Sequence, residues 1–289
     1  YFSMEFREGD RFQPTVGMND RGLFVSLQMQ FPAQAGESRH TVDELFVHEL
    51  FGSIRSFGSV EGVLEFIGNR RLVQYGGVTL HALLADGEGG AMIAEAGEEQ
   101  NELLPMDGDF IVMTNFKNSD FADQSYDQVT GAGADRYIAA HEYIGENIDG
   151  FGIEQAFETL ELTAQEGSYP TLCSMVFVPG EHSVYAALHR DFKRVWKISV
   201  LDRTIETYRG FENNMKFRIP AEGVMASDLM EGDFSAYEVY TGPDEIETDS
   251  PGQEETDRPR FVWYWAVGGL AAVMVVLIGL LVRNRRKAS

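Results

Sequence analysis

The ten residues Val16-Gly-Met-Asn-Asp-Arg-Gly-Leu-Phe-Val25 decide the predicted fold, because a polar turn with two glycines leads directly into a strand. From Leu23 to Phe31, every second residue is Leu, Val, Met or Phe, which is the alternation of a strand with one apolar face. A turn is predicted where this alternation stops, at Pro32 to Gly36. The sequence therefore predicts that this part of the chain belongs to a sheet.

Beyond this strand, helices and strands are predicted in groups. Helices are expected at 45–54, at 60–72 after a capping Ser59, and at 136–145 and 153–165. Strands are expected between and after them, at residues 78–85, 91–95, 110–115, 171–178, 184–188 and 195–200. Grouped strands and helices disfavour a parallel βαβ sheet, so the predicted class is α+β, with layered antiparallel sheets flanked by helices.

The composition narrows the classes of function. The chain has 289 residues, of which 46 are acidic and 23 basic, and its formal net charge is −23. Because nucleic-acid binding depends on Lys and Arg that neutralise phosphates, no nucleic-acid partner is expected. Cys173 is the one cysteine, so no intrachain disulfide can form, and the six histidines show no metal-ligand spacing. We therefore expect neither a metal nor a cofactor.

The C-terminal end predicts a membrane anchor. Residues 261–282 are uncharged and apolar, and at about 1.5 Å per residue they would cross the ~30 Å core of a bilayer. The basic residues of 283–289 predict a cytoplasmic tail, which places residues 1–240 outside the plasma membrane, behind a flexible acidic stalk at 241–260. A tail-anchored cytosolic protein and a buried core helix are the alternatives. The start at Tyr1, without Met or an export signal, predicts that further residues precede it.

Two asparagines lie at the ends of apolar runs. Asn19 precedes the first predicted strand, and Asn115 ends the run Phe110-Ile-Val-Met-Thr-Asn-Phe116. An asparagine side chain donates N–H bonds without carrying charge, which suits the stabilisation of an oxyanion during acyl transfer. Each asparagine is also explained as a turn residue, because Asn tolerates left-handed backbone angles.

In their order and strand context, Gly17-Met-Asn-Asp-Arg-Gly-Leu23 and Val112-Met-Thr-Asn-Phe116 resemble motifs of the choloylglycine hydrolase and penicillin V acylase superfamily. The resemblance extends loosely from Phe12 to Val200. It implies an N-terminal-nucleophile (Ntn) hydrolase with a four-layer αββα fold. In such an enzyme the first residue of the mature chain is both the nucleophile and the base.

The resemblance also implies roles for three residues. Asn19 would be an oxyanion donor, and Asn115 would hold the nucleophile and the intermediate. Arg136, in Ala134-Asp-Arg-Tyr-Ile138, would be an active-site arginine. The interval between Asn115 and Arg136 is shorter than in the bile-salt branch of the family. Arg136 is equally explained by an ion pair at a helix start with Asp135 or Glu142.

The nucleophile of that family, usually Cys, lies upstream of the Gly-Met-Asn motif. Tyr1 cannot take its role, and Cys173 lies in an apolar run typical of a buried strand, so the nucleophile is predicted to precede Tyr1. The expected reaction is hydrolysis of a linear amide C–N bond in a small acyl-amide substrate. That substrate would be an N-acyl amino acid, an acyl peptide, a penicillin or a bile-salt-like amide. An inactive surface receptor on the same scaffold and an acyltransferase are the alternative functions.

Overall fold

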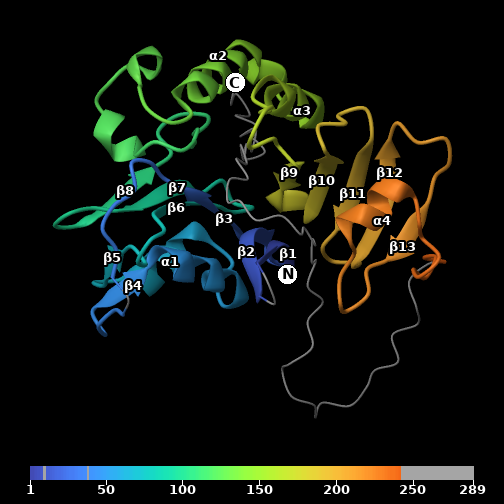
Figure 1. The fold of residues 1–289 in the computed structure, drawn as a ribbon, viewed down its shortest axis with the longest axis horizontal. Coiled ribbons are helices and arrows are strands. Elements are labelled where there is room, and N and C mark those ends of the chain that lie inside the picture. Colours follow the sequence, from blue (N-terminus) through green and yellow to red (C-terminus); the bar gives the residue numbers. More distant parts are fainter. Residues whose placement is uncertain (9–10, 38, 242–289) are drawn as a thin grey trace, which may run out of the picture.

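A computed structural model describes residues 1–8, 11–37 and 39–241 of the chain. The largest element is a six-stranded sheet in the order β1-β2-β3-β6-β7-β8, in which all neighbours are antiparallel (Figure 1). Its strands are β1 (Phe2–Glu8), β2 (Arg11–Met18), β3 (Phe24–Met29), β6 (Leu80–Ala85), β7 (Ala91–Ala96) and β8 (Asn101–Pro105). The residues of β3 are buried on both faces, apart from the partly exposed Met29, so this sheet is an inner layer.

A second antiparallel sheet has five strands in the order β13-β12-β11-β10-β9. These are β9 (Cys173–Val178), β10 (Ser183–Leu188), β11 (Val195–Ser199), β12 (Thr204–Arg209) and β13 (Lys216–Arg218). A short parallel pair, β4 (Glu44–Phe46) and β5 (Arg71–Val73), lies beside the six-stranded sheet (Figure 1).

The helices fall into groups between the strands. The α-helices are α1 (Val60–Ile67), α2 (Ala134–Asn147), α3 (Ile153–Leu162) and α4 (Ala226–Glu231). The 3₁₀ helices are η1 (Val47–Arg55), η2 (Asn118–Phe121), η3 (Tyr126–Gln128), η4 (Ile148–Gly150) and η5 (Pro179–Glu181). At the start of α1, Ser59 caps the helix as predicted, because its side chain accepts a hydrogen bond from the N–H of Gly62.

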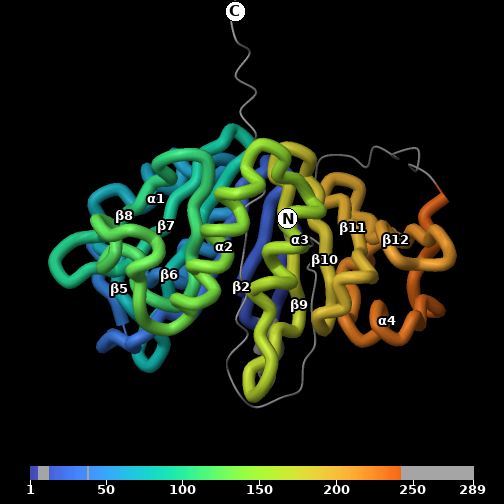
Figure 2. Tube along the Cα trace, turned by 90° about the horizontal axis from the view of Figure 1, so that it is seen from above, coloured from blue at the N-terminus to red at the C-terminus, as the bar shows by residue number. Residues whose placement is uncertain are grey.

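Three apolar cores separate the structure into four layers. The middle core lies between the two large sheets, where the rings of Phe24 on β3 and Phe177 on β9 are 4.8 Å apart. A second core joins the other face of the six-stranded sheet to η1 and α1. A third core joins β9 and β10 to α2 and α3, and Figure 2 shows these two helices side by side. The layers are therefore helix, sheet, sheet and helix, as the family resemblance implied.

The predicted fold class is wrong where it included a transmembrane helix. No helix in the described part of the chain is long and apolar enough to cross a membrane. The longest there, α2, has 14 residues and is about 21 Å long, shorter than the ~30 Å core of a bilayer. This finding also contradicts the predicted plasma-membrane location. The predicted span at 261–282, the tail at 283–289 and stalk residues 242–260 lie outside the described residues.

Other element predictions were wrong in detail. The predicted strand at 110–115 is irregular, and the strand that follows β7 is β8. The predicted helix at 60–72 ends at Ile67, where Gly68 has a positive φ of 53°, and the chain continues into β5. Neither β1 nor β2 was predicted, although Phe2, Met4 and Phe6 of β1 alternate with polar residues as a strand pattern does. The strands β3, β6, β7, β9, β10 and β11 and the helices α2 and α3 were predicted within a few residues of their ends.

Candidate functional site

Residues 112–119, called here the Asn115 segment, carry the first candidate residue. The side chain of Asn115 is 5% exposed and bonds in two directions. Its Nδ2 donates to the carbonyl oxygen of Met29 at 2.7 Å, and its Oδ1 accepts from Nη2 of Arg136 at 2.8 Å. The carbonyl oxygen of Asn115 also accepts from the N–H of Phe31. Asn115 therefore joins the end of β3 to the first turn of α2.

Arg136 is a buried cation at the start of α2, with an exposed fraction of 7%. Its Nε and Nη1 have no hydrogen-bond partner among the described residues, and no described carboxylate forms an ion pair with it. Burial lowers the pKa of Arg136, although the charge of Asp135 acts in the opposite direction. The ion pair with Asp135 or Glu142 that the sequence allowed is therefore not formed. Nε and Nη1 of the buried guanidinium therefore remain to bind a group with oxygen acceptors.

The loop before α2 is shaped to admit this arginine. Gly133, the residue that precedes the helix, has a left-handed φ of 80°. A Cβ atom at this position would lie 2.6 Å from Nη2 of Arg136 and 3.1 Å from Cβ of Thr114. Glycine is therefore required twice, once by the backbone angle and once by the close approach of the guanidinium.

His81 and Glu95 belong to the same region, and the sequence analysis missed them. His81 on β6 lies with its Nε2 2.7 Å from the carbonyl oxygen of Thr114, and its Nδ1 3.0 Å from Oε1 of Glu95 on β7. Both side chains are fully buried. The available signal was a histidine and a glutamate in otherwise apolar strands, at positions that only the strand register brings together.

Asn19 is placed elsewhere. Its Nδ2 donates to the carbonyl oxygens of Ile54 and Phe57 at 2.8 and 2.6 Å, and its Oδ1 accepts from the N–H groups of Arg21 and Leu23. These contacts fix the turn at the beginning of β3, whereas Asn115 contacts its end. Six residues of extended strand separate the two places, or about 20 Å. The structure thus brings Asn115 and Arg136 together and leaves Asn19 apart.

Cys173 lies in the core between the sheets. Burial raises the pKa of its thiol far above the usual value, so that the nucleophilic thiolate does not form near neutral pH. Cys173 is therefore a core residue, as the sequence favoured. No group of His, Cys, Asp and Glu side chains in the described residues is arranged to hold a metal ion.

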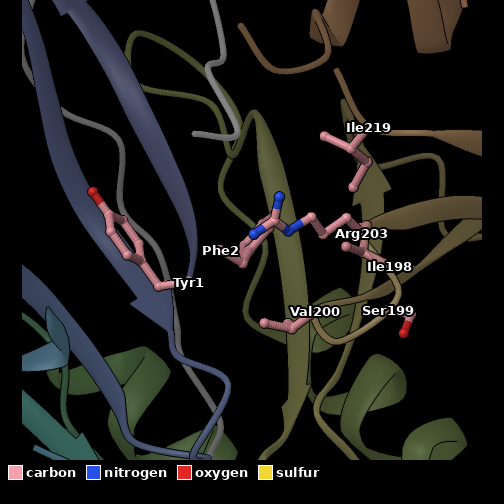
Figure 3. A pocket seen from close by; sticks show the side chains of 7 residues that line it. All are labelled: Tyr1, Phe2, Ile198, Ser199, Val200, Arg203 and Ile219. Atoms are coloured by element: carbon pink, nitrogen blue, oxygen red, sulfur yellow. The ribbon is translucent and has the colours of Figure 1, made fainter. Parts of the chain in front are cut away.

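A small pocket opens at the Asn19 end of the six-stranded sheet rather than beside Arg136. Figure 3 shows the side chain of Arg203 extending toward Phe2, which is paired with Met18, the residue before Asn19. The remaining lining residues are Tyr1, Ile198, Ser199, Val200 and Ile219. The pocket is little larger than a water molecule needs, so we locate the candidate chemistry at the buried cation instead.

Comparison with known proteins gives structural similarity alone. No protein-family model and no curated protein sequence matches the chain. Two variants of conjugated bile acid hydrolase from Clostridium perfringens are similar to it, each with 15% identity and a TM-score of 0.44. The matches cover 74% of this chain and 79% and 80% of the hydrolase chains.

Penicillin V acylase from Agrobacterium tumefaciens is also similar, with 14% identity and a TM-score of 0.41, over 72% of this chain and 66% of the acylase. The solved structures similar to this chain thus include a bile acid hydrolase and a penicillin V acylase. The superfamily that its sequence motifs resemble is named after these two kinds of protein.

Proposed function

We propose that this chain is the main scaffold of an Ntn-type hydrolase of linear amide C–N bonds. The observation that carries the proposal is the buried guanidinium of Arg136, which has two unpartnered donors and is held by Asn115. Leaving a buried charge without a counter-charge is costly, so such a residue is more typical of a functional site than of a core. The proposed substrates are N-acyl amino acids, acyl peptides, penicillins and bile-salt-like amides, which all contain the bond in question.

Arg136 would stabilise negative charge on the substrate. Because an arginine stays protonated despite a lowered pKa, its Nε and Nη1 can donate to a carbonyl oxygen that gains charge as the nucleophile attacks. Asn115 occupies Nη2 and thereby fixes the plane of the guanidinium. Asn19 was predicted as an oxyanion donor from the family resemblance. Its two amide hydrogens are engaged with carbonyl groups, so it would have to give up one of them to act.

The nucleophile of the proposed reaction is an N-terminal Cys, Ser or Thr that precedes Tyr1. In the proposed sequence of steps, its thiolate or alkoxide adds to the amide carbonyl. The C–N bond then breaks, and the amine leaves with a proton supplied by the α-ammonium group. Water next attacks the acyl-enzyme and releases the acid. Cys173 does not suit this role, because its thiol is buried.

The decisive experiment begins with the mature N-terminus of the full-length protein, determined by mass spectrometry. Amine release is then measured on a panel of N-acyl amino acids and penicillins. We expect Arg136→Gln to lower kcat/KM about 10²-fold or more, as removal of one oxyanion donor typically does. Arg194→Gln is the control, since the Arg194 side chain is half exposed and pairs with Asp191. Mature protein without an N-terminal Cys, Ser or Thr would refute the enzymatic proposal.

A binding protein on the same scaffold, without catalysis, is the second candidate. It is favoured by the contacts of Asn19, whose amide is fully engaged in fixing a turn. In that case the same panel would bind without turnover, and Arg136→Gln would weaken binding. An added amine acceptor in the enzymatic assay distinguishes an acyltransferase, because transfer would yield a new amide in place of the free acid.

A further inference from the structure

The most unusual group outside the proposed reaction is the pair formed by His81 and Glu95. Ala82 pairs with Ala94 in the antiparallel register of β6 and β7, so the flanking His81 and Glu95 lie opposite each other. Both side chains have an exposed fraction of 0%. A histidine and a glutamate thus meet in the interior of a sheet whose other positions are mainly apolar.

The hydrogen bonds of the pair are consistent with a charged Glu95. Nε2 of His81 faces a carbonyl oxygen, that of Thr114, and must therefore carry a hydrogen. The carboxyl of Glu95 accepts from two backbone N–H groups, those of Asn118 at 2.8 Å and Ser119 at 2.9 Å. Burial raises the pKa of Glu95, but the hydrogen bond and charge of His81 and these two N–H groups outweigh burial, so its pKa is lowered. Glu95 is then a carboxylate, and its Oε1 lies 3.0 Å from Nδ1 of His81.

The contacts of the pair converge on the Asn115 segment. His81 binds the segment at Thr114, directly before Asn115, and Glu95 binds it at Asn118 and Ser119. The segment is not part of a strand, so these bonds replace those that a sheet would provide. Apolar side chains of similar volume would fill the same space and are often at least as stabilising as a buried ion pair, but they cannot bind carbonyl and N–H groups.

We propose that His81 and Glu95 are positioning residues, which hold the Asn115 segment so that Asn115 presents Arg136 in its working orientation. This inference rests on the proposed function only for its catalytic consequence. The geometric part concerns the protein alone. A six-residue stretch, 114–119, is held near both ends by one buried pair of side chains, and the residue that contacts Arg136 lies between the two attachments.

The geometric part is tested by amide hydrogen exchange and NMR on the full-length chain. In Glu95→Gln, we expect the amides of Asn118 and Ser119 to exchange about tenfold faster or more, and the side-chain NH₂ signal of Asn115 to shift. Amides of β10 should keep their rates. The control is Asp120→Asn in the same region, because the Asp120 side chain is mostly exposed, pairs with Lys117 and does not contact His81 or Glu95, so it should change none of these signals. Unchanged exchange at Asn118 and Ser119 in Glu95→Gln would overturn the inference, whatever the activity.

A variant that simply fails to fold is distinguished by two further proteins. The double variant His81→Leu/Glu95→Met removes both polar groups and keeps an apolar interior, so its fold should be retained while the Asn115 signal still shifts. His81→Gln keeps a donor for Thr114 and should shift that signal less than His81→Leu. If the double variant matches the wild type at Asn115, the pair has no positioning role.

The catalytic part is read from the same variants with the amide substrates. We expect Glu95→Gln to lower kcat more than it raises KM, because the group that stabilises charge in the transition state loses its orientation. If the wild type shows no amide hydrolysis but the exchange and NMR changes occur, the proposed function fails and the positioning inference stands. If hydrolysis occurs and Glu95→Gln leaves kcat unchanged, the catalytic consequence of the positioning is refuted while the proposed function stands.

Discussion

Nη2 of Arg136 donates to Oδ1 of Asn115 over 2.8 Å, and this bond links the irregular segment after β8 to the first turn of α2. Both residues are largely buried. The bond therefore unites two layers of the structure at the one place where an unpaired arginine enters the described interior.

Loss of the Asn115 side chain is expected to destabilise the fold. Asn115→Ala removes the acceptor of Arg136 and the donor to Met29, and leaves buried polar groups unsatisfied. We expect the free energy of unfolding to fall by about 2–3 kcal/mol, measured by urea denaturation. Asn213→Ala, at an exposed position, should change it by less than about 0.5 kcal/mol. Equal stability of the two variants would contradict the importance of this bond.

Gly133 and Gly145 provide a matched comparison around one helix. Gly133→Ala introduces a Cβ 2.6 Å from Nη2 of Arg136 at a φ of 80°, so we expect a loss of about 1–3 kcal/mol in stability. Gly145 lies within α2 and nothing is within 4 Å of its added Cβ, so Gly145→Ala should gain about 0.5–1 kcal/mol. Thermal unfolding of both variants checks the prediction, which fails if the two shifts have the same sign.

The free energy of unfolding at acidic pH should depend on Glu95. Its pKa in the folded protein lies below its value in the unfolded chain, which is about 4.3. As the pH falls, the Glu95 carboxyl therefore binds a proton in the unfolded chain first. The stabilisation from Glu95 is fully present above the unfolded pKa and is lost as the pH falls through the folded pKa. We expect wild-type stability to fall more steeply below about pH 4.3 than that of Glu95→Gln. Parallel curves from denaturation at a series of pH values would disprove this.

Cys173 should resist thiol reagents in the folded protein. The residue is buried, and burial raises the pKa of its thiol, so neither access nor thiolate is available. We expect the peptide containing Cys173 to remain unlabelled by iodoacetamide under native conditions and to be labelled fully in denaturant. Peptide mapping separates this thiol from any other in the mature protein. Rapid native labelling at Cys173 would contradict the packing described.

The spacing of apolar residues predicted the inner strands and the two longer helices, because each of these elements packs against a neighbouring layer on a defined side. For example, Val25, Leu84 and Val176 lie in elements whose burial follows from sequence pattern alone. The apolar run that ends at Asn115 misled the prediction. Its apolar residues are buried, but side chains rather than neighbouring strands satisfy its backbone at Val112 and Thr114.

The candidate site was predictable only in part. Asn115 and Arg136 were found through a family resemblance, whereas His81 and Glu95 needed the register between β6 and β7 to become partners. The separation of Asn19 from Asn115 depends on the length of β3, which short motifs do not encode. Local patterns therefore identified single residues, and the strand pairing decided which of them meet.

The attachment of the Asn115 segment to β6 and β7 has a consequence for sequence variation among relatives of this chain. Thr114, Asn118 and Ser119 are tied to the sheet, so these attachments do not depend on the mostly exposed stretch that follows, from Asp120 to Gln128. Insertions, deletions and new sequences in that stretch would leave the three attachments in place. An evolving or engineered protein could thus alter this loop while inheriting the same attachment of the Asn115 segment.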